Sequence, residues 1–130
     1  MDEQEPGRLR QHSEPRFAGP QHAFDLEEVA ARLKQEVNAG EAGHRQQTLY
    51  KHGPTSVSLF LFEHLTRLAP HRAKGVVNIL VLKGHLRVTA EGQVHDLRAG
   101  GLLVLAPGIE HDVVAREESQ RLLTVHLSVN

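Results

Sequence analysis

With 130 residues the chain is long enough for one folded domain with a modest hydrophobic core, and no second domain is expected. Its 15 basic and 16 acidic side chains nearly balance, so the formal charge of −1 gives no long-range attraction to nucleic acid or to an anionic membrane. The absence of cysteine excludes disulfides, thiolate catalysis and cysteine-bound zinc, and the short apolar runs exclude a membrane-spanning helix and a signal peptide, so we expect a cytoplasmic protein.

Residues 1–22 are predicted to form a flexible tail. Proline, glycine and charged residues dominate this stretch, which has few large apolar side chains, among them Leu9 and Phe17. So little apolar surface cannot offset the entropy that is lost on ordering. We therefore expect the tail to be ordered only where a partner binds it.

Residues 23–46 are predicted to form one amphipathic helix and a linker. Apolar side chains recur at helical spacing, at Leu26, Val29, Ala30, Leu33 and Val37. Asp25 is a suitable N-cap and Gly40 a suitable stop, for a helix of about three to four turns. A single helix has no core of its own, so we expect its apolar face to cover the outside of a sheet or a second subunit.

Residues 47–130 are predicted to be all-β. The segments are short, aliphatic or β-branched, and separated by turn residues, which is typical of many antiparallel strands at close spacing. Lys83–Gly84 and Glu91–Gly92 are interpreted as two-residue hairpin turns, because glycine adopts the positive φ that such turns need. The pattern indicates a jelly-roll barrel, or double-stranded β-helix. The expected strands lie near residues 47–51, 56–65, 76–82, 85–90, 93–97, 102–105, 111–115 and 121–128.

The most informative motif runs from Gly100 to His111. A glycine turn, an apolar strand and a Pro–Gly turn precede a single histidine, which is typical of a hairpin that directs one imidazole into a barrel. The corresponding upstream segment, which ends at Gly84, contains one further histidine, His71.

With these motifs, residues 65–127 resemble the cupins, and in particular the small single-domain bacterial cupins with an RmlC-like barrel. The first cupin motif, G(X)5HXH(X)3-4E(X)6G, is matched here by His71 and Gly84. Ala73 stands at its second histidine and Val77 at its glutamate.

The second cupin motif, G(X)5PXG(X)2H(X)3N, is matched by Gly100, Gly108 and His111. Ala106 stands at its proline and Ala115 at its asparagine. The resemblance therefore implies a cupin barrel with a degenerate metal-binding motif.

A metal centre of the cupin type needs three or four nitrogen and oxygen donors around the ion. His71 and His111 supply two, and a third would have to come from His64, His126 or Glu63. Strand alternation decides which of these side chains points inward, but residues 57–65 are apolar on both faces and leave this open. The cofactor is therefore undetermined, and the residues favour at most a weakly held divalent transition metal.

Three functions stay open, and no catalytic residue is predicted. The first is a small-molecule-binding cupin without strong metal-dependent catalysis, whose ligand contacts His71, His111, Val77, Ile79 and Val81. The second is a metal-dependent dioxygenase or isomerase-like enzyme that uses His71, His111 and an unidentified third ligand. The third is an interaction role of the tail. The resemblance also implies a homodimer, since related small barrels often pair.

Overall fold

The protein is represented by a computed structural model, which describes residues 19–36 and 43–128. The predicted tail up to residue 18 and the predicted helix stop at Gly40 lie outside these ranges. Within them, no helix is both long and apolar enough to cross a bilayer. The described elements are α2 (Leu26–Lys34), β1 (His44–His52), β2 (Thr55–Phe62), β3 (Arg67–His71), β4 (Gly75–Lys83), β5 (His85–Ala90), β6 (Gln93–Arg98), β7 (Leu102–Leu105), β8 (His111–Ala115) and β9 (Ser119–Leu127).

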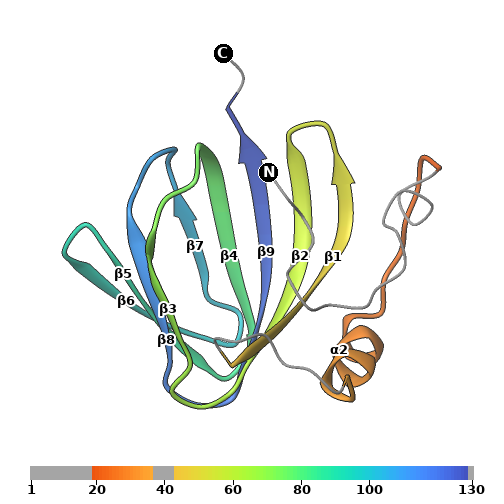
Figure 1. The fold of residues 1–130 in the computed structure, drawn as a ribbon, viewed down its shortest axis with the longest axis horizontal. Helices are drawn as coiled ribbons and strands as arrows, with labels where there is room; N and C mark the ends of the chain where they lie inside the picture. The colour runs from red at the N-terminus through yellow and green to blue at the C-terminus, as the bar shows by residue number, and fades with distance from the viewer. Residues whose placement is uncertain (1–18, 37–42, 129–130) are drawn as a thin grey trace.

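The strands form two antiparallel sheets that curve around a common interior (Figure 1). One sheet has the strand order β1-β2-β9-β4-β7 and the other has the order β3-β8-β5-β6. From β2 onward the chain passes repeatedly from one sheet to the other, which is the connectivity of a jelly roll. The predicted all-β jelly-roll barrel is confirmed.

The core lies between the two sheets. Burial alternates along β4, β5 and β8, so that every second side chain points inward. The inward set is almost entirely aliphatic and includes Ile79, Val81, Leu86, Val88 and Val113, which have no solvent exposure. The interior of the barrel is therefore apolar, and a polar group buried there is costly unless it is hydrogen-bonded or paired.

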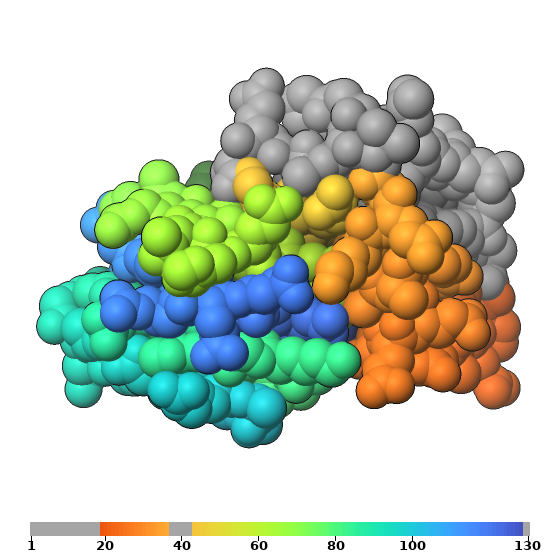
Figure 2. Space-filling view, turned by 90° about the horizontal axis from the view of Figure 1, so that it is seen from below, coloured from red at the N-terminus to blue at the C-terminus, as the bar shows by residue number. Residues whose placement is uncertain are grey.

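Helix α2 covers the outer face of β1 and β2. Asp25 caps it as predicted, because its carboxylate accepts hydrogen bonds from the backbone N–H groups of Glu27 and Glu28 at 3.1 and 3.2 Å. A second apolar cluster, made of Val29, Ala30, Leu33, Leu49, Leu59 and Leu61, joins the helix to the sheet. Seen from the lower end of the barrel, the helix in orange lies against one flank only (Figure 2).

This arrangement explains why β2 is apolar on both faces. Phe60 and Phe62 point into the barrel, whereas Leu59 and Leu61 pack under the helix. The helix is nine residues long and ends at Lys34, so it is shorter than predicted.

The strand prediction missed β3. The long strand expected over residues 56–65 ends at Phe62, and Leu65 adopts a positive φ of 69° between β2 and β3. The sequence pattern did not predict β3, because this strand contains Pro70 and only Leu68 of its five residues is partly buried. It therefore lacks the alternation by which a strand is recognised.

Two predicted hairpins are instead crossings between sheets. Lys83–Gly84 joins β4 to β5, and Pro107–Gly108 joins β7 to β8, and in both cases the two strands belong to different sheets. Glu91–Gly92 is a true hairpin turn between β5 and β6, with φ values of 48° and 83°. Turn glycines thus marked where strands end but not which strands pair.

Candidate ligand-binding site in the barrel

His71 and His111 lie side by side inside one end of the four-stranded sheet. They are register partners on β3 and β8, so their side chains leave the sheet on the same face. Their ring centroids are 4.3 Å apart and the ring planes are inclined by 55°. His111 is buried and His71 is exposed, so the pair connects the interior to the solvent.

Hydrogen bonds determine which ring nitrogen carries the proton when each imidazole is neutral. Nδ1 of His71 donates to the carbonyl of Ala69 at 2.8 Å, and Nδ1 of His111 donates to the carbonyl of Ile109 at 3.1 Å. A carbonyl only accepts, so Nδ1 carries the proton and Nε2 keeps its lone pair in each ring. Both Nε2 atoms can therefore accept a hydrogen bond from a ligand.

The pKa of His111 is lowered from its ordinary value. Burial is the main cause, and the nearby charges of His71 and Arg121 lower it further. The hydrogen bond to Ile109 acts in the opposite direction. His111 therefore favours the neutral form, in which Nε2 is an acceptor.

A cavity of about 580 Å³ opens next to His71, whereas His111 is not among the residues that line it. Its polar wall comes from β1 and β2 and contains Gln46, Thr48, Ser56 and Ser58. The apolar part of the lining comes from Phe60 on β2 and from Leu123, Val125 and Leu127 on the neighbouring strand β9, while His71, Arg72, Ala73, Lys74 and Ser128 complete the lining. The cavity is therefore amphipathic, with a basic rim.

The other predicted site residues lie away from this cavity. Val77, Ile79 and Val81 are buried in the barrel core and are not among the cavity-lining residues. His126 is exposed and its Nδ1 is 2.8 Å from the hydroxyl of Thr55, because Val125 takes the inward position of β9. His64 is exposed in the turn between β2 and β3.

The residues present do not fit a metal centre of the cupin type. Ala73 and Val77, which occupy two of the ligand positions of the first cupin motif, have no donor atoms. Within residues 19–36 and 43–128, no group of three or more histidine, cysteine, aspartate or glutamate side chains could hold an ion. Two imidazoles alone fall short of the three or four donors that such an ion needs.

The sequence analysis missed Arg121, the most unusual polar residue of the barrel. It lies in the middle of β9, paired with Phe60 on β2 and Val81 on β4, and only 2% of it is exposed. Its guanidinium carbon is 4.3 Å from the centre of the Phe60 ring and 5.2 Å from that of Phe62. Side chains alternate between the two faces of a strand, so Arg121 shares the inward face of β9 with Leu123 and Val125, and this alternation could have predicted its burial.

The guanidinium of Arg121 has no anionic partner among the described residues. Its Nε and Nη1 atoms are buried without a hydrogen bond. Burial lowers the pKa of Arg121 to about 9, whereas an arginine normally stays charged to much higher pH. The barrel thus holds a buried cation that stacks on two aromatic rings and forms no ion pair with the described residues.

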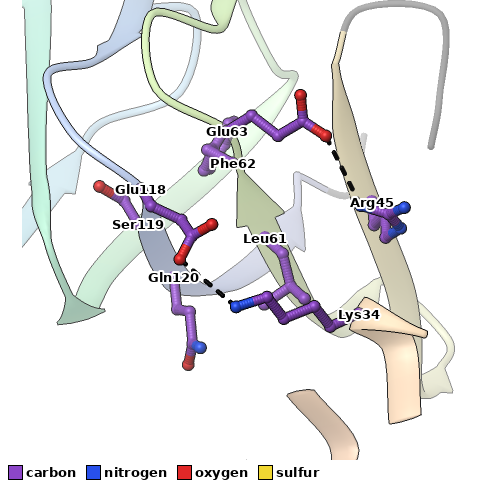
Figure 3. A pocket seen from close by; sticks show the side chains of 8 residues that line it. All are labelled: Lys34, Arg45, Leu61, Phe62, Glu63, Glu118, Ser119 and Gln120. Atoms are coloured by element: carbon purple, nitrogen blue, oxygen red, sulfur yellow. Dashed lines mark hydrogen bonds and ion pairs between the residues drawn. The ribbon is translucent and has the colours of Figure 1, made fainter. Parts of the chain in front are cut away.

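A second, smaller cavity of about 240 Å³ lies between α2 and the lower end of the barrel (Figure 3). Its charged side chains already pair with each other. Lys34 contacts Glu118 at 3.4 Å and Arg45 contacts Glu63 at 3.7 Å. These ion pairs leave fewer charged groups for a ligand here than in the barrel cavity.

Comparisons with known proteins agree with the barrel geometry. A conserved protein of unknown function from Streptococcus pyogenes superposes with a TM-score of 0.68 at 23% identity, over 88% of this chain and 96% of that one. A cupin superfamily protein from Desulfitobacterium hafniense has a TM-score of 0.65 at 20% identity, over 71% and 84% of the two chains. An RmlC-like cupin from Shewanella frigidimarina has a TM-score of 0.66 at 19% identity, over 73% and 86%.

At these identities the solved structures establish the fold alone. No curated protein sequence is significantly similar to this chain. The family profile described as "Cupin domain" matches residues 61–126, which is half of the chain and includes both histidines of the site. Together with the jelly-roll connectivity, this match shows that the chain belongs to the cupin superfamily, as one of its small members.

Proposed function

We propose that this cupin binds one small organic molecule in the barrel cavity, in contact with His71 and His111, without a firmly held metal. The cavity itself carries the proposal, because its volume of about 580 Å³ falls within the range of about 300 to 1,000 Å³ that is usual for ligand sites. The Nε2 atom of His71 and the hydroxyl groups of the polar wall provide the few convergent polar contacts that orient a ligand, and the ring of His111 lies next to that of His71.

The proposal is tested by filling the cavity. Ser56→Phe places a bulky ring on the cavity wall, whereas Thr89→Phe places the same ring on the outer face of β5, away from the cavity. Compounds from a library of small organic molecules are expected to raise the melting temperature of the natural protein and of Thr89→Phe, because a ligand of the native state stabilises it. They are expected not to stabilise Ser56→Phe. Equal stabilisation of both variants would contradict the proposal.

A metal-dependent dioxygenase or isomerase-like enzyme is the second candidate. The observation in its favour is that neither Nε2 atom of the His71–His111 pair is used by a hydrogen bond within the described chain. Metal analysis of untagged protein tests it. About one first-row metal per chain, lost in His71→Ala, would favour the enzyme. A chain without bound metal that still responds to small molecules would favour the binding function.

A homodimer is supported by apolar side chains on the outer face of β4 and β7. Val76, Leu102 and Val104 are 38%, 59% and 56% exposed, on the part of the five-stranded sheet that lies away from α2. Light scattering after size-exclusion chromatography is expected to give twice the mass of the chain, and Leu102→Lys with Val104→Lys is expected to give the monomer.

The interaction role of residues 1–22 also remains a proposal. Deletion of these residues is expected to abolish capture of a partner and to leave small-molecule binding unchanged if the tail acts independently of the barrel. A loss of small-molecule binding in the truncated chain would contradict that independence.

A further inference from the structure

The buried charge of Arg121 is the feature of the barrel that the proposed function leaves unexplained. A charged group inside a protein is normally paired, because its transfer from water is costly without a counter-charge. Stacking on Phe60 and Phe62 supplies part of the stabilisation, but rings cannot accept the hydrogen bonds of Nε and Nη1. The missing partner is an anion that also accepts hydrogen bonds.

Within residues 19–36 and 43–128, no buried side chain supplies such an anion. The buried polar side chains of the described residues include His44, His111 and Arg121, but no aspartate or glutamate. The charge of Arg121 contributes to the lowered pKa of His111, so the two side chains interact electrostatically inside the barrel. Arg72 and Lys74 add positive charge at the cavity rim, although Arg72 pairs with Glu110 at 3.6 Å. The site is therefore electrostatically suited to an anion rather than a cation.

Arg121 lies at the inner end of the cavity, behind the ring of Phe60. Arg121 and Leu123 point to the same side of β9, and Leu123 and Phe60 both line the cavity. Arg121 itself is not part of the lining, since its guanidinium stacks on the Phe60 ring. For an anion in the cavity to reach the guanidinium, the Phe60 side chain has to rotate away from it.

We propose that Arg121 binds the carboxylate of a compact organic acid held in the barrel, which makes this protein a carboxylate-binding cupin. This inference rests on the proposed function, because it requires that the cavity takes a small molecule. The guanidinium matches a planar carboxylate and forms strong charge-assisted hydrogen bonds with it. The apolar wall of Leu123, Val125 and Leu127 accommodates a hydrocarbon portion, and Thr48 and Ser58 face its polar substituents.

The test uses the full chain and two matched series of probes. One series contains straight-chain carboxylates from acetate to hexanoate, and the other contains the corresponding neutral primary amides. Binding is followed by ¹H–¹⁵N NMR, which includes the Nε–H group of Arg121 and therefore reads the site without any substitution. Arg121→Met removes the buried charge, and Arg98→Met removes a charge from a side chain that is 69% exposed on β6.

The carboxylates are expected to shift the Arg121 Nε–H resonance and to bind more tightly than the amides. Arg121→Met is expected to weaken carboxylate binding at least about tenfold, as for the loss of a hydrogen bond to a charged group, whereas Arg98→Met leaves it unchanged. Well-dispersed spectra of both variants establish that they fold.

Two other outcomes overturn the inference in distinguishable ways. If the amides bind as tightly as the carboxylates and Arg121→Met retains both, the cavity binds small molecules but Arg121 is not the anchor. If neither series binds at any length, the inference is contradicted, and the compound library with the Ser56→Phe and Thr89→Phe variants decides separately whether the cavity binds small molecules.

Discussion

Replacing Arg121 by methionine is expected to stabilise the ligand-free protein. Burial lowers the pKa of Arg121 to about 9, and at about 1.4 kcal/mol per pH unit this fall from the ordinary value corresponds to roughly 5 kcal/mol against the charged form. The cation–π contacts with Phe60 and Phe62 offset about 2 kcal/mol of that cost. Methionine keeps an apolar stem against the same rings, so Arg121→Met is expected to gain about 1 to 3 kcal/mol in unfolding free energy, within the range seen when buried charges are replaced by apolar groups.

The assay is equilibrium unfolding in urea, which adds no competing ions. Arg98→Met is the matched control and is expected to stay within about 0.5 kcal/mol of the natural protein. The cost of the buried charge is fully present below about pH 9 and is relieved as the pH rises above that value, because the unfolded chain then holds the proton that the native chain has lost. The advantage of Arg121→Met is thus expected to shrink above pH 9. A loss of more than about 1 kcal/mol in Arg121→Met would refute the reasoning, because it would mean that the native guanidinium is well paired.

Three further predictions concern the pH dependence and local geometry. Burial lowers the pKa of His111, so the unfolded chain takes up a proton there at a higher pH than the native chain does, and the unfolding free energy is expected to fall as the pH drops below about 6.5. Urea unfolding between pH 7 and 5 should show a steeper loss of stability for the natural protein than for His111→Leu. Equal slopes would count against this prediction. Gly84→Ala is expected to cost roughly 2 to 4 kcal/mol, since φ is +87° and a Cβ would meet the backbone of the β8–β9 turn. Gly92→Ala, with φ +83° and open space, should cost only about 1 kcal/mol, and similar losses at both glycines would refute the steric argument. Asp25→Ala should lower stability by about 1 kcal/mol through the lost cap, with Asp25→Asn close to the natural protein in the same unfolding assay.

Much of the fold can be predicted from local sequence patterns. Alternating aliphatic residues in β4, β5 and β8 predict strands with one buried face, and the capped apolar stripe that begins after Asp25 predicts a helix that covers a sheet. The spacing of His71 and His111 within the two cupin motifs predicts that both belong to one site, and their rings are neighbours. These features depend on residues close in sequence, or on motif spacing that the fold family shares.

Strand pairing and the character of the site were decided by tertiary structure. Lys83–Gly84 has the composition of a hairpin turn, but β4 pairs with β7 and β9, because contacts between distant strands outweigh local turn preference. The direction of His126 depends on the register of β9, which places Val125 inward.

Local patterns and motif spacing therefore predict an all-β cupin barrel with two histidines in one site, and they leave open whether a third donor completes a metal site. The packing of the strands places Arg121 against the aromatic rings of Phe60 and Phe62 on β2, close to the cavity, and the described residues include no buried carboxylate. An arginine in a strand is normally expected to be exposed, and its burial can be recognised only when the residues packed around it are known. The cost of its burial, and hence its need for an anion, arises from surroundings that distant strands assemble.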